Sequence, residues 1–134
     1  MESRAMGEAV LPTMELLPQR IPKLSAAVLC TPDGFNICSL GVDERQVGKL
    51  AALSGSLLSI GHATVSEILP GGAGDQLELL SLKGGNYQIV GTKVRQPTSH
   101  LVLLVAAPDT ALGIMIVGAQ YVASLLEKQL GVAA

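Results

Sequence analysis

The first regular pattern of apolar and polar positions in the chain is that of a β-hairpin. Residues 24–31 and 35–40 are two short apolar runs, and Thr-Pro-Asp-Gly lies at their junction. Proline at the second position of a turn, followed by Asp and by a Gly that tolerates positive φ, is typical of a type I turn. We therefore predict a hairpin whose turn residues are Pro32, Asp33 and Gly34.

A helical period begins after this hairpin. Asp43, with Gln46 three residues later, matches a capping box, and apolar residues recur every three or four positions from Val47 to Ile68. The Pro-Gly-Gly of residues 70–72 is expected to end the helix. Small side chains, which let another backbone approach closely, flank the apolar stripe, so we expect packing against another helix. These small residues are Ala51, Ala52, Ser54, Gly55, Ser56, Ser59 and Ala63.

Three further strands and a last helix are predicted in the second half of the chain. Residues 75–83 and 87–94 flank a Gly-Gly-Asn turn, and residues 101–107 are apolar on both faces, which is typical of a central strand. Asp109 is expected to cap the last helix, which ends near Gly131. This helix is apolar nearly all round, so we expect it to be deeply buried. Its second apolar stripe comprises Ile114, Val117, Tyr121 and Leu125.

The N-terminal segment is interrupted by prolines. Pro12 is expected to begin a short apolar helix that includes Met14, and Pro18 to stop or kink it. We predict that residues 1–15 form an extension, partly disordered or with a short helix, and that residues 16–131 form one domain. The predicted fold class is α/β (α+β): a five-stranded antiparallel sheet with the long helix on one face and the terminal helices on the other.

Composition narrows the possible functions. Hydrophobic residues make up 49% of the 134 residues and charged residues 15%, which excludes disorder. A net charge of −2 and an aromatic content of 2% point away from nucleic acid as a partner. The first ten residues do not resemble a signal peptide, and residues 110–126 are short for a membrane span. The cytoplasm is therefore the expected location.

The two cysteines flank the predicted hairpin turn. A three-residue loop places Cys30 opposite Asn36 and Val28 opposite Cys38, so the two sulfurs share a face as diagonal neighbours. Such neighbours lie about 7–8 Å apart, beyond the reach of an unstrained disulfide. We expect both cysteines to be ordinary sheet residues, since a zinc site needs more ligands than this region offers.

No other group of residues predicts catalysis. His62 has no metal ligand three or four positions away, and His100 points away from its neighbour Ser99 on a strand. The glycines near residues 41–48 and 71–74 lack the spacing and context of phosphate-binding loops. We therefore predict no catalytic, metal-binding or cofactor-binding residue.

The order of the elements resembles one known family. Along the chain come residues 21–29 (IPKLSAAVL), the Pro-Asp-Gly-Phe turn, the small-residue helix, the Leu-rich strand at 77–82, the LVLLVAA strand and the Ala-Leu-Gly of residues 111–113. This order of elements resembles that of the Roadblock family. The similarity covers about residues 16–130. Two departures are Lys23, where the family favours Gly, and the prolines that interrupt the first helix.

The resemblance implies a protein that is not an enzyme. Roadblock proteins are homodimers or heterodimers in which the strand after the long helix pairs across a two-fold axis and the long helices pack together. Bacterial members are partners or regulators of small Ras-like GTPases, and eukaryotic relatives serve in dynein and in signalling scaffolds. By position, the implied dimer residues are Ala51, Leu53, Ser54 and Leu58 on the helix and Leu77 and Leu79 on the strand.

We therefore expect a homodimeric, non-enzymatic regulatory or scaffold module that binds a small Ras-like GTPase or another signalling protein. The rim of its binding surface is predicted to carry the charges of Asp43, Glu44, Arg45 and Lys49. One alternative is a small-ligand sensor with a buried cavity lined by residues such as Val105 and Met115. Another is a thiol enzyme, which requires one cysteine with a lowered pKa.

Overall fold

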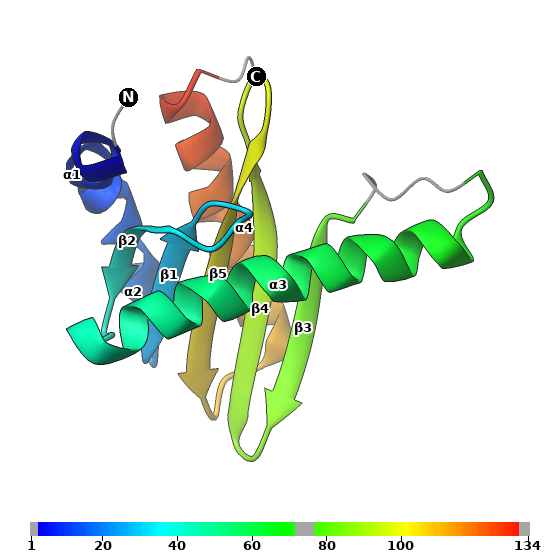
Figure 1. The fold of residues 1–134 in the computed structure, drawn as a ribbon. Helices are drawn as coiled ribbons and strands as arrows, with labels where there is room; N and C mark the ends of the chain where they lie inside the picture. The colour runs from blue at the N-terminus through cyan, green and yellow to red at the C-terminus, as the bar shows by residue number, and fades with distance from the viewer. Residues whose placement is uncertain (1–2, 72–76, 132–134) are drawn as a thin grey trace.

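The computed structural model describes residues 3–71 and 77–131, which form one sheet with helices on both faces (Figure 1). In chain order the elements are α1 (Ser3–Met14), α2 (Leu17–Arg20), β1 (Ala26–Cys30), β2 (Asn36–Leu40), α3 (Glu44–Ile68), β3 (Leu79–Gly84), β4 (Tyr87–Arg95), β5 (His100–Pro108) and α4 (Leu112–Gln129). None of the described helices has the length and hydropathy needed to cross a membrane.

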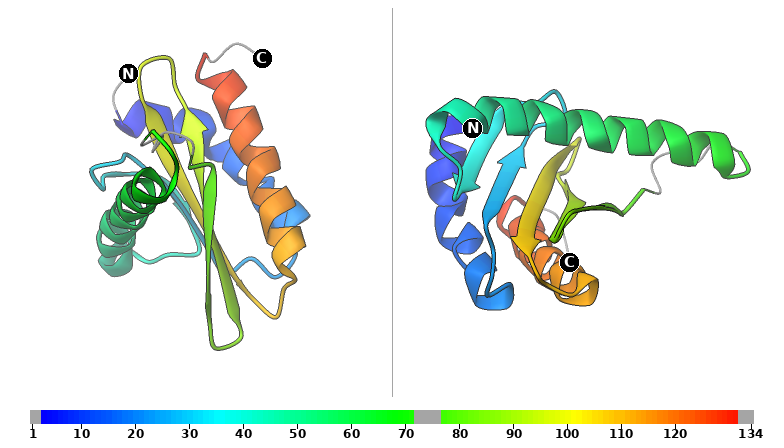
Figure 2. Two further views of the ribbon diagram at one scale, coloured as in Figure 1. Left: turned by 90° about the vertical axis from the view of Figure 1, so that its right-hand side faces the viewer. Right: turned by 90° about the horizontal axis from the view of Figure 1, so that it is seen from below.

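The sheet is antiparallel throughout, in the order β2-β1-β5-β4-β3. Helix α3 crosses one face, and the helices from the two ends of the chain cover the other (Figure 2). Leu29, Leu103 and Val105 point into the core under the terminal helices, whereas Val28 and Val102 point into a smaller core under α3. The predicted fold class is therefore confirmed, including β5 as a central strand covered on both faces.

The helix that was expected to begin at Pro12 begins much earlier, at Ser3, so that prediction was wrong. Pro12 lies inside α1, where it has no N–H to donate to the carbonyl of Glu8. The helix persists because Val10 and Met14 are fully buried against the sheet. Pro18 stands in the first turn of α2, where a backbone N–H has no helical partner to lose. The domain boundary at residue 16 stays a prediction.

The predicted hairpin is confirmed, but its register differs. The Gly34 N–H donates to the Thr31 carbonyl at 3.0 Å, and Gly34 adopts a φ of 95°. Cys30 pairs with Asn36 as predicted, but a bulge then places Cys38 opposite Leu29 instead of Val28. One extra residue turns the following side chains to the other face. Cys30 therefore packs under α3 and Cys38 under the terminal helices, and the prediction of a shared face was wrong.

Helix α3 has the predicted cap, since Asp43 Oδ1 accepts hydrogen bonds from the N–H groups of Arg45 and Gln46 at 3.0 Å. Two of its small residues, Ala52 and Gly55, meet the β1–β2 turn, and the expected packing of α3 against another helix stays a prediction. A Cβ on Gly55 would lie 2.5 Å from the Pro32 carbonyl oxygen, and one on Gly34 would lie 2.8 Å from the Cα of Ala52. The small side chains therefore allow close contact between the helix and the hairpin.

Helix α4 is buried on one side only, so the expectation of deep burial all round was wrong. Met115 and Leu126 are fully buried, but Ile114, Val117 and Tyr121 are exposed. The physical reason is that α4 forms an outer layer, which contacts the sheet with one face. Asp109 does not cap the helix either; it adopts a φ of 47°, and Ala111 is the residue that precedes the first turn.

Candidate functional site

Strand β3 forms an edge of the sheet, and it pairs only with β4 among the described strands. Its sequence, Leu-Leu-Ser-Leu-Lys-Gly, has no proline and one charge. Residues 81–84 are all exposed, and Leu82 is 41% exposed. An exposed apolar edge of this kind is a template for pairing with another strand.

Helix α3 is longer than the sheet beneath it is wide. Its 25 residues span about 37 Å at 1.5 Å per residue, whereas five strands spaced about 4.8 Å apart span about 19 Å between the outer strand axes. The C-terminal half of the helix accordingly extends beyond β3 (Figures 1 and 2). Near its end Ile68 is 74% exposed, and Ile60, beside the Gly61 that contacts Leu77 and Leu80, is 63% exposed.

Part of the sheet face on the α3 side is not covered by α3. A Cβ on Gly61 of the helix would contact Leu80, which shows that Leu80 points toward α3. Leu82 and its cross-strand partner Ile89 therefore lie on the same face, farther along the strands. Both lie outside the apolar cluster beneath α3, and Tyr87, two residues before Ile89, is 38% exposed. An edge, an overhanging helix and an apolar sheet face thus lie side by side.

Most of the helix residues predicted for the dimer contact are unavailable for it. Ala51, Ser54 and Leu58 are at most 2% exposed, and they point toward the sheet within the same chain. Only Leu53, at 51% exposed, faces outward. The predicted interface stays a prediction, with Leu53 as its accessible member on this stretch of the helix.

The two strand residues predicted for the same contact also differ from each other. Leu77 precedes β3 and is only 8% exposed, because it packs beneath Gly61 of α3. Leu79 is the first residue of β3 and is half-buried. The part of the predicted strand at residues 75–76 lies outside the described residues.

The predicted rim charges lie together at the N-terminal end of α3. All four residues are exposed, although Asp43 also uses Oδ1 of its carboxylate to cap the helix. The four charges are therefore accessible to a partner.

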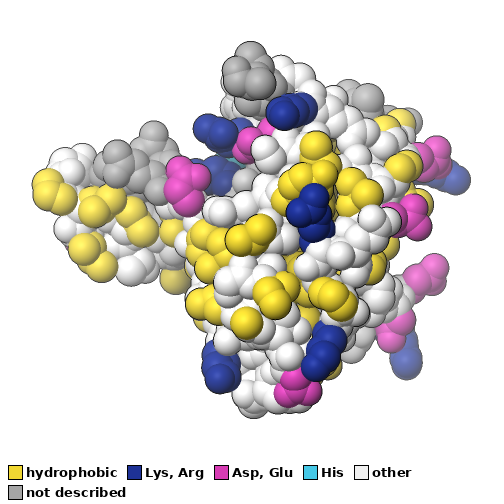
Figure 3. All heavy atoms as spheres, turned by 180° about the vertical axis from the view of Figure 1, so that it is seen from behind, with side chains coloured by type: hydrophobic (Ala, Val, Ile, Leu, Met, Phe, Trp, Pro, Cys, Tyr) yellow, Lys and Arg dark blue, Asp and Glu magenta, His cyan; other side chains and the backbone are white. Residues whose placement is uncertain are grey.

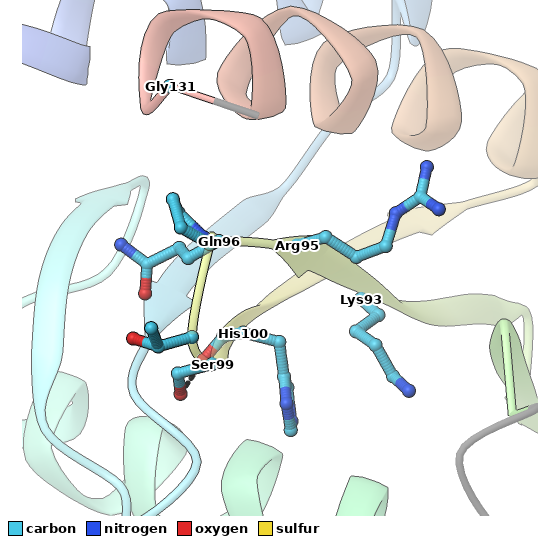
Figure 4. Close-up of a pocket in the computed structure, with 8 residues that line it drawn as sticks. Lys93, Arg95, Gln96, Ser99, His100 and Gly131 are labelled. Atoms are coloured by element: carbon cyan, nitrogen blue, oxygen red, sulfur yellow. Dashed lines mark hydrogen bonds between the residues drawn. The ribbon is translucent and has the colours of Figure 1, made fainter. Parts of the chain in front are cut away.

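A hollow of about 600 Å³ lies at the β4–β5 turn, and it includes Lys93, Arg95 and His100 among its lining residues. In Figure 4, Lys93 and His100 point to one side of the turn and Arg95 to the other. The imidazole of His100 lies 5.7 Å from that of His62 on α3, between ring centroids. Burial, together with the charge of Lys93 and the proximity of His62, lowers the pKa of His100.

Arg95 is held by Glu127 of α4. Its Nε and Nη2 donate to the two carboxylate oxygens at 3.0 and 3.2 Å, and its backbone N–H donates to Oε2 at 2.8 Å. Burial acts to raise the pKa of Glu127, but these hydrogen bonds outweigh it and lower the pKa. The pair therefore joins the β4–β5 turn to the last helix, and it is already charge-compensated.

The cysteines do not have the environment of a reactive thiol. Burial raises the pKa of Cys30 to about 11, and burial also raises the pKa of Cys38. A thiolate nucleophile requires the opposite shift. Within the described residues there is also no group of three or more His, Cys, Asp or Glu residues that could hold a metal ion.

The two residues named for a small-ligand cavity, Val105 and Met115, are fully buried in the core that the sheet shares with the terminal helices. Neither residue lines the hollow at the β4–β5 turn or the hollow against α4.

Sequence reasoning missed the accessible part of the candidate surface, which comprises Ile60, Ile68, Leu82, Ile89 and Tyr87. Periodicity placed Ile68 at the end of an apolar stripe that begins at Val47, and it did not show that this end lies beyond the sheet. The missing signal is geometric: a helix of 25 residues is too long for a five-stranded sheet to cover.

Comparison with known proteins places this geometry in a known fold. No protein-family model matches the sequence, and no curated protein matches it significantly. Among solved structures, a Roadblock/LC7 domain from Streptomyces avermitilis is 24% identical, with a TM-score of 0.70, over 87% of this chain and 90% of that one.

Two bacterial proteins named MglB give similar superpositions. MglB of Myxococcus xanthus is 16% identical over 91% of this chain and 87% of its own, with a TM-score of 0.74. The gliding protein MglB of Thermus thermophilus is 15% identical over 96% of this chain and 93% of its own, also with a TM-score of 0.74. The chain therefore has the fold of the Roadblock/LC7 domain.

Proposed function

We propose that the chain is a non-enzymatic regulatory module, which acts as a homodimer and binds a small Ras-like GTPase. The observation that carries the proposal is the free apolar edge of β3 beside the overhanging half of α3. The chain shares its fold with Roadblock/LC7 and MglB proteins. Its sequence resembles the Roadblock family, whose bacterial members are partners or regulators of such GTPases.

The geometry supports a two-fold arrangement of two copies. A two-fold axis beside β3 pairs the β3 strands of both chains, which removes the exposed edge from each. The same rotation places the overhanging half of each α3 above the sheet of the other chain. Ile68 then has an apolar surface to cover, namely the face that carries Leu82 and Ile89. Ile60, seven residues after the outward-facing Leu53, lies on the side of α3 that points away from the sheet. One two-fold rotation thus covers three exposed features: the edge of β3, the overhanging half of α3, and the sheet face that carries Leu82 and Ile89.

The GTPase is proposed to bind on the layer formed by the two α3 helices. The accessible charges at the N-terminal end of α3, those of Asp43, Glu44, Arg45 and Lys49, are the proposed rim of this surface. Charged rims mainly set association rate and partner choice, so their effect should depend on salt.

A titration with purified Ras-like GTPases from the same organism tests the partner. Each GTPase is loaded with GDP or with a non-hydrolysable GTP analogue, and binding is followed by calorimetry. We expect one GTPase to bind, with an affinity that differs at least tenfold between the two nucleotides, and the double change Arg45→Glu and Lys49→Glu to weaken it. Absence of binding for every GTPase at about 100 μM contradicts the proposed partner.

A further inference from the structure

The outward side of α4 carries a stripe of apolar side chains that the rest of the described chain does not cover. Ile114, Val117 and Tyr121 are 48%, 63% and 38% exposed. Their spacing of three and four residues places them in one line along the helix. Figure 3 shows apolar side chains gathered on this face, with Lys and Arg side chains among and around them. This face lies on the opposite side of the sheet from α3.

A hollow of about 510 Å³ lies along this stripe. Its lining residues are Arg20, Ala111, Gly113, Ile114, Val117 and Gly118. Gly118 is required where the chain after α2 meets α4, because a Cβ there would lie 2.7 Å from Cγ1 of Ile21. The result is a shallow groove with α2 on one side and the apolar stripe of α4 on the other.

The net charge beside this groove is positive, with Arg20 and Lys23 against the single carboxylate of Asp109. The guanidinium carbon of Arg20 lies 3.7 Å from the centre of the Tyr121 ring, and Lys23 Nζ donates to the Asp109 carbonyl oxygen at 3.4 Å. Among the described residues no carboxylate forms a salt bridge with either cation, and no acidic residue lines the hollow. The carboxyl group of Asp109 instead accepts a hydrogen bond from Asn86. An acidic partner is thus favoured over a basic one.

We propose that this α2–α4 groove binds an amphipathic helix of another protein, with apolar residues along one face and acidic residues beside them. Ile114 to Tyr121 extends about 10 Å at 1.5 Å per residue, which matches two turns of a docked helix. A second copy of the chain is a poorer occupant, because its own groove presents the same positive charges. The proposal does not depend on the dimer or on the GTPase.

The test is a selection from a displayed library of 18-residue helical peptides with randomised surface positions. Immobilised wild-type chain is the target, and the best peptide is then synthesised and titrated by fluorescence anisotropy. We expect selected peptides to carry a two-turn apolar stripe flanked by Asp or Glu. Val117→Asp should weaken binding at least tenfold, as truncation of a central contact typically does. Phe35→Asp, at a site 65% exposed in the hairpin, is the matched control and should leave affinity unchanged.

A charge exchange makes the result specific. Arg20→Glu should weaken binding of the acidic peptide at least fivefold. A peptide with Lys in place of its acidic residues should bind this variant with the lost affinity restored. Circular dichroism shows whether each variant keeps its helix content; if Val117→Asp does not, Arg20→Glu decides alone. The proposal is overturned if no peptide is selected, if the selected peptides lack acidic residues, or if their binding is unaffected by the groove variants.

Discussion

Two glycines of α3 differ only in what surrounds them, and this difference predicts opposite effects of the same substitution. A Cβ on Gly48 meets no atom within 4 Å, whereas a Cβ on Gly55 would lie 2.5 Å from the Pro32 carbonyl oxygen and 3.3 Å from the Gly34 nitrogen. Gly48→Ala should therefore stabilise the protein, and Gly55→Ala should destabilise it.

The magnitude follows from two terms. Replacing Gly by Ala inside a helix stabilises it by about 1 kcal/mol at both positions. At Gly55 the neighbouring atoms belong to the backbone of a tight turn and cannot rotate away, so overpacking costs about 3 kcal/mol. The net change is then about 1 kcal/mol of stabilisation at Gly48 and about 2 kcal/mol of destabilisation at Gly55. For a chain of this size the gap corresponds to a difference in Tm of about 10 °C.

Urea unfolding followed by circular dichroism, at one fixed protein concentration, measures both free energies. The concentration is fixed because dimerisation raises apparent stability by mass action. If Gly55→Ala proves as stabilising as Gly48→Ala, then α3 does not rest on the β1–β2 turn, and the explanation of its small residues is refuted.

Four further predictions rest on titrating groups. Because the folded pKa of Cys30 is raised to about 11, unfolding should become easier as pH rises from about 9 to 11, and Cys30→Ala should flatten this part of the stability curve. For the same reason, both Cys30 and Cys38 should react slowly with iodoacetamide at neutral pH in the native state and rapidly in urea; fast native labelling of one contradicts the burial. The lowered pKa of Glu127 adds stability above its ordinary titration range that is lost as pH falls, so Glu127→Gln should reduce the acid dependence of unfolding. His100 should titrate below its ordinary pKa by NMR, and Lys93→Met should raise that value.

The elements of the fold were predictable because each carries a local signal. The turn residues Pro32 to Gly34, the cap at Asp43 and the two-sided apolar run of β5 all act within a few residues of themselves. The order of these elements was sufficient to identify the antiparallel sheet.

The errors come from features that depend on distant parts of the chain. Pro12 is unfavourable in a helix on its own, but burial of Val10 and Met14 against the sheet outweighs that cost. The bulge adds one residue, Ile37, to β2 between the partners of Cys30 and Leu29, and no glycine marks it in the sequence. Periodicity identifies the apolar face of a helix, but it does not show whether the structure beneath that face extends as far as the helix does.

The same limit applies to the candidate site. The strand after the long helix was correctly expected at an edge, yet Leu77 proved to be a buried contact of α3. A charge at Leu77 would therefore disturb the fold as well as any dimer. Leu82, 41% exposed on the same edge strand, is the better position at which to test association.

Sedimentation equilibrium at micromolar concentration tests the central claim most directly, because it reports mass without assuming shape. We expect the wild-type chain and the control variant Phe35→Lys to have twice the 13.8 kDa mass of one chain, and Leu82→Lys to sediment at 13.8 kDa with its circular dichroism spectrum unchanged. A wild-type mass of 13.8 kDa across this range, or a Leu82→Lys variant that dimerises as tightly as the wild type, contradicts the proposal that the β3 edge and the overhanging α3 helix form the interface of a homodimer.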